Sequence, residues 1–243
     1  NWLAGTAFSN DASATGVGTI DSSGQVNTEA GFSIISYTGS TSESVAHGLS
    51  QAPEAIFVKN RSVATNWAVY HQGVQDTTTN GFLELNSTAA IQTGSNPRFL
   101  SGTASTSQPT SSVFYVNNYS GSSTNNTGND FIAYCFHSVD GYSKFGSFSG
   151  NSSSTDAPFV YLGFRPAFII IKGISTTTHW ILQDNKRPGY NQTSIALFSN
   201  LTNAESTDRH VDFVSNGFKL RLTALDPNTN GTNYVYFAFA EQP

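Results

Sequence analysis

One seven-residue pattern occurs twice in this chain. Residues 53–59 read PEAIFVK and residues 166–172 read PAFIIIK. A tryptophan stands eight residues after each lysine, and one offset of 113 residues (166 − 53, 172 − 59 and 180 − 67) relates the two prolines, lysines and tryptophans. Residue type and spacing recur together, which indicates an internal duplication and rules out one enzyme fold running the length of the chain. Tandem copies of one β-module are common in multivalent binding proteins.

The repeat extends on both sides of this core and sets the expected domain boundaries. Each copy ends in an aromatic run, at 131–136 and at 234–239, with Gly128 and Gly231 three residues before. The expected organisation is therefore three segments. Residues 1–30 are a strand and linker that follow a preceding region, residues 31–142 the first repeat, and residues 143–243 the second.

Composition indicates the fold class. Charged residues make up 11% of the chain and aromatic residues 13%, with 18 Phe and 10 Tyr. An average soluble domain has about 25% charged residues. Aromatic and β-branched residues suit a pleated, half-buried surface, and no amphipathic helix pattern of useful length occurs. We predict an all-β chain of two tandem β-sandwich units, lectin-like or jelly-roll-like, related by internal duplication.

Charge and hydropathy exclude two classes of partner. The net charge is −5 and the 11 Lys and Arg are scattered singly, so no basic patch for nucleic acid is expected. No apolar run approaches the roughly 20 residues of a membrane span, so no membrane insertion is expected. Met is absent, from which we expect a segment of a longer polypeptide. The one cysteine, Cys135, lies in an aromatic run and is expected to pack as a small hydrophobe.

The sequence predicts neither catalytic residues nor a metal site or cofactor. The acidic residues lie mostly in turn-like sequence, where solvated and capping carboxylates are the expected roles. The Gly-x-Ser-x-Gly motif of hydrolases is missing, and the five His show no spacing that favours zinc or iron. Residues 226–231 resemble the start of a calcium loop, but Phe237 stands where a bidentate Glu belongs. An Asx-rich hairpin turn explains that segment better.

Aromatic side chains are the candidate ligand-binding residues, because exposed rings stack on sugars. The conserved spacing of the repeat instead places its own members in the structural core: Pro53, Lys59, Trp67, Pro166, Lys172 and Trp180. Four tyrosines near polar loops are the better candidates for an accessible binding surface: Tyr115, Tyr119, Tyr142 and Tyr190. The loops around 101–128 and 185–193 are expected to present the contacts.

Long strings in both copies resemble a recurrent domain of tailed-bacteriophage virion proteins of the marine and cyanophage type. They include GFSIISYTG at 31–39, IFVKNRS at 56–62, NWAVYH at 66–71, FIAYCF at 131–136 and SNGFKL at 215–220. The resemblance covers nearly the whole chain from about residue 15. It implies a tail fibre or other virion structural protein and supplies no catalytic residue.

The resulting expectation is a non-enzymatic tail-fibre or appendage module for host-surface attachment, located on the virion and more on the tail than on the head. Its expected partners are other virion proteins, further copies of itself in a trimer, and a glycan or protein of the host surface. Two alternatives stay open at this point. One is a capsid or tail decoration protein that stabilises the particle, and the other is a polysaccharide-binding or depolymerase module.

Overall fold

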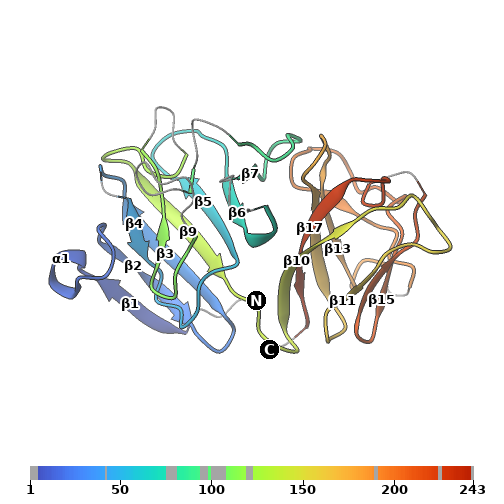
Figure 1. Cartoon of the computed structure of the whole chain (residues 1–243), viewed down its shortest axis with the longest axis horizontal. Helices are drawn as coiled ribbons and strands as arrows, with labels where there is room; N and C mark the ends of the chain where they lie inside the picture. The colour runs from blue at the N-terminus through green and yellow to red at the C-terminus, as the bar shows by residue number, and fades with distance from the viewer. Residues whose placement is uncertain are drawn as a thin grey trace. The chain divides into compact units, whose positions relative to one another are not determined.

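The structure is a computed structural model that describes residues 5–41, 43–74, 81–93, 98–99, 108–118, 123–188, 191–223 and 226–241. It is built almost entirely of antiparallel strands, which confirms the predicted all-β sandwich class (Figure 1). The chain divides into two compact units. Unit 1 is Asn1–Glu84 with Gln92–His137, and unit 2 is Leu85–Ile91 with Ser138–Pro243.

Among the described residues, no helix has the length and apolar character needed to cross a membrane.

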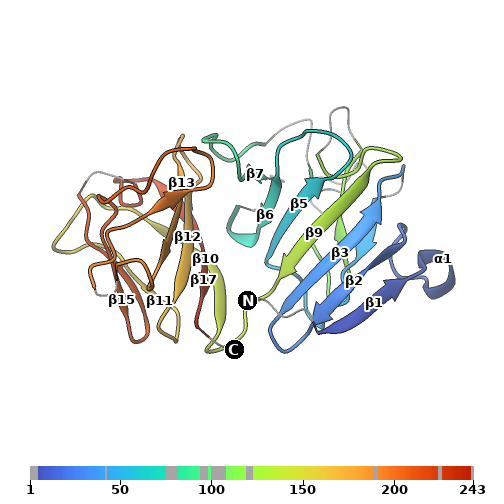
Figure 2. The ribbon, with the colours of Figure 1, turned by 180° about the vertical axis from the view of Figure 1, so that it is seen from behind.

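Unit 1 contains a large sheet and a small one. The large sheet has the order β1-β2-β3-β9-β5-β6-β7, and Figure 2 shows its first five strands side by side. Its strands are β1 (Thr6–Asn10), β2 (Ser22–Asn27), β3 (Phe32–Thr38), β9 (Asp130–Phe136), β5 (Ala55–Asn60), β6 (Ala68–His71) and β7 (Leu83–Glu84). The small sheet pairs β4 (Ser44–Ala46) with β8 (Val113–Tyr115). A short helix α1 (Ala12–Thr15) follows β1, and a 3-10 turn η1 (Gln72–Val74) follows β6.

The core of unit 1 lies between these two sheets. Alternate residues of the large sheet point inward, among them Ile35, Val58 and Phe131, and meet Val45 and Phe114 of the small sheet. Successive side chains of a strand point to opposite faces, so the same strands place their other residues on the outer face. The two-sheet core is what makes this unit a β-sandwich.

Unit 2 is also a sandwich of two sheets. The larger sheet has the order β10-β17-β12-β13-β14 and the smaller one β11-β16-β15. Its strands are β10 (Ser143–Ser149), β17 (Asn233–Phe239), β12 (Phe168–Gly173), β13 (Trp180–Asp184), β14 (Leu197–Phe198), β11 (Phe159–Tyr161), β16 (Gly217–Leu220) and β15 (Val211–Val214). Inward-pointing residues from both sheets form its core, including Ile171 and Tyr236 of the larger sheet and Val160, Phe213 and Phe218 of the smaller.

The two units share a strand order and a register. The order β3-β9-β5-β6-β7 in unit 1 matches β10-β17-β12-β13-β14 in unit 2. Ala55 pairs with Phe136 at the start of β5, and Phe168 pairs with Phe239 at the start of β12. Ala55 and Phe168 are related by the same 113-residue offset (168 − 55) that relates the repeated motifs, whereas Phe136 and Phe239 are 103 residues apart (239 − 136). A shared topology is what a duplication predicts; the duplication itself stays a prediction.

The unit boundaries differ from the expected ones in three places. The junction between the units falls between His137 and Ser138, and not between residues 142 and 143. The segment expected as a strand and linker forms β1 and β2, which extend the large sheet of unit 1 beyond β3. Residues 85–91 belong to unit 2, where Ile91 N donates to Ile174 O and Thr178 N donates to Thr88 O. The last two differences accompany backbone hydrogen bonds, which apolar alternation and repeat spacing do not report.

Candidate functional site

Strand β11 carries two exposed aromatic rings on the surface of unit 2. Phe159 is 47% exposed and Tyr161 is 60% exposed, while Val160 between them is buried in the core. The strand lies at the edge of the three-stranded sheet. The alternation of a strand therefore places both rings on the same outward face. We call Phe159 and Tyr161 the aromatic platform.

A glycine on the neighbouring strand lets β11 approach closely. Gly217 is the cross-strand partner of Tyr161. A Cβ at Gly217 would stand 2.0 Å from Val160 O and 3.2 Å from Cε2 of Phe159. Because Gly217 has no side chain, the Phe159 ring lies against its backbone, as aromatic residues do beside glycines in sheets. Phe159 thus has a structural role as well as an exposed face.

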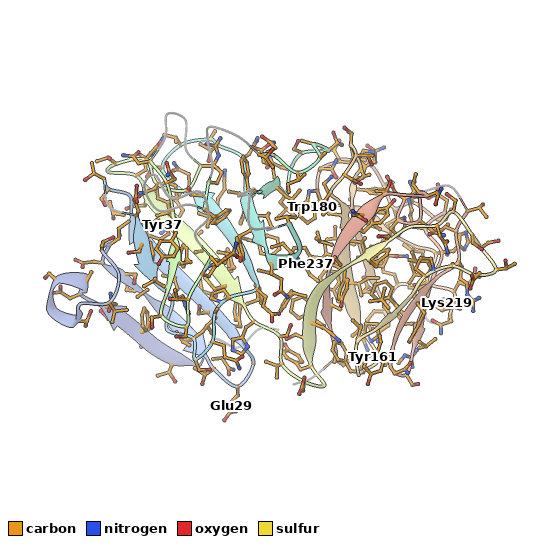
Figure 3. The ribbon with its side chains drawn as sticks, in the orientation of Figure 1. Glu29, Tyr37, Tyr161, Trp180, Lys219 and Phe237 are labelled. Atoms are coloured by element: carbon orange, nitrogen blue, oxygen red, sulfur yellow. The ribbon has the colours of Figure 1, made fainter. Side chains whose placement is uncertain are left out.

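Charged side chains border the platform. Lys144 of β10 places its Nζ 5.3 Å from the centroid of the Tyr161 ring and donates a hydrogen bond of 3.2 Å to Tyr161 O. Lys219 is the cross-strand partner of Phe159, and Figure 3 shows it on the same unit as Tyr161. Asp212 pairs across from Lys219 and accepts a 2.5 Å hydrogen bond from Arg221 Nε.

This arrangement suits recognition of a ligand that has an apolar face and a polar rim. Aromatic faces pack against the C–H face of a pyranose ring, while ammonium groups donate to its hydroxyls. The ammonium of Lys144 over the Tyr161 ring adds a cation–π contact of the kind that contributes about 0.5–1 kcal/mol at exposed sites. The aromatic platform is therefore a candidate surface for glycan binding.

The four tyrosines predicted from the sequence as accessible differ in how exposed the structure shows them to be. Tyr115, at the end of β8, is half-buried. The expectation that Tyr142 is accessible is wrong: it is 7% exposed, and its ring packs edge-to-face against Phe239 at 6.5 Å. The high aromatic content around it encloses it despite the polar neighbours in sequence. Tyr119 and Tyr190 lie outside the described residues.

The repeat residues occupy positions that differ in burial between the units. Pro53 and Pro166 are both buried. Trp180 is fully buried, whereas Trp67 is half-buried, with its ring 6.2 Å from that of Tyr134. Lys172 is likewise fully buried, whereas Lys59 is half-buried.

The segment that resembles a calcium loop is held by its own hydrogen bonds. Asn228 is fully buried; its Nδ2 donates to Leu222 O and Ser153 O, and its Oδ1 accepts from Asn151 N. Asp226 accepts from the hydroxyl of Tyr234 at 2.7 Å. In the part of the chain that the structure describes, no three His, Cys, Asp or Glu side chains come together as a metal site.

Phe159 and Tyr161 were missed as candidates from the sequence, although a signal was present. An aromatic residue on each side of Val160 is the alternation of a half-buried strand, and Pro158 and Gly163 bound the segment. The two residues lie on a short edge strand and not in a polar loop, so the polarity of the neighbouring sequence does not indicate their exposure. Edge strands commonly leave outward-facing side chains accessible, so the alternation predicts exposure better than the polarity of the flanking loops.

Comparison with known protein families places the chain in a family. The whole chain, residues 1–243, matches the family model described as Domain of unknown function (DUF7483). No curated protein and no solved structure matches the chain.

Proposed function

The chain belongs to the DUF7483 family, and we propose that it is a non-enzymatic structural module of a phage virion, in a tail fibre or related appendage, that attaches the particle to a host-surface glycan. In this proposal the module assembles with other virion proteins and with copies of itself, a trimer being the expected arrangement. The resemblance of the repeated strings to virion proteins supports the setting. The aromatic platform supports the attachment role.

The observation that carries the proposal is the pair of exposed rings on β11. An exposed Phe and Tyr two residues apart on one strand face form a continuous apolar surface. Most other aromatic residues that the structure describes are buried or half-buried, and the exposed large apolar residues besides this pair are Val63 and Leu201. Lys144 and Lys219 supply donors at the border of the rings.

A glycan array of bacterial surface polysaccharides tests the attachment role. The purified chain is expected to retain at least one glycan class, and the Phe159→Ala/Tyr161→Ala variant is expected to bind that class about tenfold more weakly, which corresponds to about 1.4 kcal/mol. Val63→Ala is the matched control, because Val63 is an exposed apolar side chain in unit 1. Thermal unfolding of each variant verifies that it is folded.

Two results would contradict the proposal. One is an array on which the wild-type chain binds no glycan. The other is a double variant that binds every glycan as tightly as the wild type and Val63→Ala do.

A further inference from the structure

Unit 1 has a concave surface at one end of its large sheet. It is a hollow of about 430 Å³ at the end of the large sheet where β1 and β3 finish and β2 and β9 begin. The residues between β1 and β2, which include helix α1, border one side of it. Its volume falls within the range of about 300–1,000 Å³ that is typical of small-molecule sites.

Three serines on adjacent strands line the hollow. Ser9 of β1 pairs with Ser23 of β2, which pairs with Ser36 of β3. Neighbouring strands lie about 4.8 Å apart, so the three serines form a row across the sheet. Ser23 Oγ and Ser36 Oγ are 3.4 Å apart, and Ser36 Oγ donates to Ser23 O at 3.0 Å. Each serine hydroxyl can both donate and accept.

Charged groups stand at two sides of this row. Asp130 and Arg61 line the hollow beyond Ser36, with Arg61 N donating to Asp130 O at 2.7 Å. Asp21 lines it beside β2, and its Oδ1 accepts from Ala12 N at 2.8 Å. The carboxylates accept hydrogen bonds and the guanidinium only donates them. The lining therefore offers both kinds of partner that a pair of neighbouring sugar hydroxyls requires.

The border of the hollow is fixed before any ligand binds. Asn10 Nδ2 donates to Val17 O at 2.9 Å, and the bond from Ala12 N to Asp21 ties the start of α1 to the start of β2. Asp11 caps the N-terminus of α1 by accepting from Ala14 N at 3.0 Å. A loop held in this way loses little conformational freedom on binding, which favours affinity.

We propose that this hollow, which we call the serine hollow, binds a neutral oligosaccharide. The row of hydroxyls and the opposed acceptor and donor groups match vicinal hydroxyls. The carboxylates of the lining outnumber its one guanidinium, so a uronate or phosphorylated sugar meets net repulsion. The site is independent of the aromatic platform, which lies in unit 2.

The experiment uses the Phe159→Ala/Tyr161→Ala chain, so that the aromatic platform does not contribute. On an array of neutral, amino and acidic bacterial glycans, this variant is expected to retain neutral glycans in preference to acidic ones. Adding Asp21→Asn or Arg61→Ala is expected to weaken that retention about tenfold. Both side chains are exposed, so folding is expected to survive. Asp156→Asn is the control, because Asp156 is an exposed carboxylate of unit 2.

Three outcomes would contradict the proposal that the serine hollow binds a neutral oligosaccharide. They are no retention of any neutral glycan, retention that favours acidic glycans, and retention unchanged by both substitutions. None of them tests the role of the aromatic platform. That role is tested by comparing the glycan binding of the wild-type chain with that of the Phe159→Ala/Tyr161→Ala variant.

Discussion

The ammonium nitrogen of Lys172 donates a 3.0 Å hydrogen bond to the carbonyl oxygen of Thr178, six residues further along the chain. Lys59 makes the same bond to Thr65, also six residues on, at 2.5 Å. Each bond closes the loop of a hairpin, between β12 and β13 or between β5 and β6. The repeated lysine therefore has a structural explanation in both copies: it holds the loop that leads to the repeated tryptophan.

Replacing these lysines with methionine is expected to destabilise the two units unequally. Lys172 is fully buried and donates to three carbonyls and to the hydroxyl of Thr178. Lys172→Met removes all four hydrogen bonds of this buried side chain, and the expected loss in the free energy of unfolding is about 2–4 kcal/mol. Lys59→Met removes one bond from a half-buried side chain, with an expected loss of about 1 kcal/mol. Urea unfolding measures both, and a larger effect at Lys59 would contradict this explanation.

The Asx-rich turn at 226–231 is expected to stabilise unit 2 without a metal. Asn228→Ala removes three hydrogen bonds of a fully buried side chain, for which we expect a loss of about 2–4 kcal/mol. Neither calcium nor EDTA is expected to change the unfolding temperature of the wild type. A rise of several degrees on adding calcium would show instead that the turn is a cation site.

Protonation of His47 is expected to weaken unit 1 in acid. Its Nδ1 accepts from Leu49 N at 3.1 Å, so the neutral ring carries its proton on Nε2, which lies 3.0 Å from Thr110 O. Burial lowers the pKa of His47 from 6.5 to about 4. A pKa depressed by folding gives stability that is lost as the pH falls from 6.5 towards 4, by up to about 3 kcal/mol.

The variant His47→Asn isolates this effect. Asparagine keeps an acceptor for Leu49 N but does not titrate. The free energy of unfolding of the wild type is expected to fall more steeply than that of the variant between pH 6.5 and 4. Parallel pH profiles for the two proteins would exclude His47 as the cause.

Adding a side chain at Gly217, where β16 pairs with β11, is expected to disturb the aromatic platform. A Cβ at this position meets Val160 O at 2.0 Å, so Gly217→Ala must displace one strand. We expect a loss of about 1–3 kcal/mol in stability and weaker glycan binding. Gly128→Ala is the comparison, since a Cβ there meets no atom within 4 Å, although its φ of +78° adds backbone strain. Calorimetric unfolding should show whether steric overlap at Gly217 costs more than this strain.

The sequence was sufficient for the fold class and for the central strands. The repeated PEAIFVK and PAFIIIK strings supply most of β5 and β12, and the aromatic runs supply most of β9 and β17. Both aromatic runs alternate between a core face and an outer face, with Tyr236 in the core of unit 2 and Phe237 on the other side of the strand. A strand that is packed on both faces needs apolar residues at successive positions, and such a continuous apolar run is easy to recognise in the sequence.

The same reasoning failed where strands are short, polar or held only by backbone bonds. β1 and β2 consist mainly of Ser, Thr, Asn and Gly, without apolar alternation, so residues 1–30 resembled a linker. Residues 85–91 follow the first repeat in sequence but pair within unit 2. The exposure of Tyr161 and the burial of Tyr142 depend on tertiary packing, which the polarity of neighbouring residues does not report.

The position of this chain on the assembled virion tests most directly the proposal that it attaches a virus particle to its host. Cryo-electron microscopy of the particle, at a resolution that allows the chain to be traced, is the measurement. If the chain is an attachment module, we expect symmetric oligomers at the distal part of a tail appendage, with the aromatic platform of β11 facing outward. Copies distributed over the capsid lattice would contradict it and identify the chain as a decoration protein.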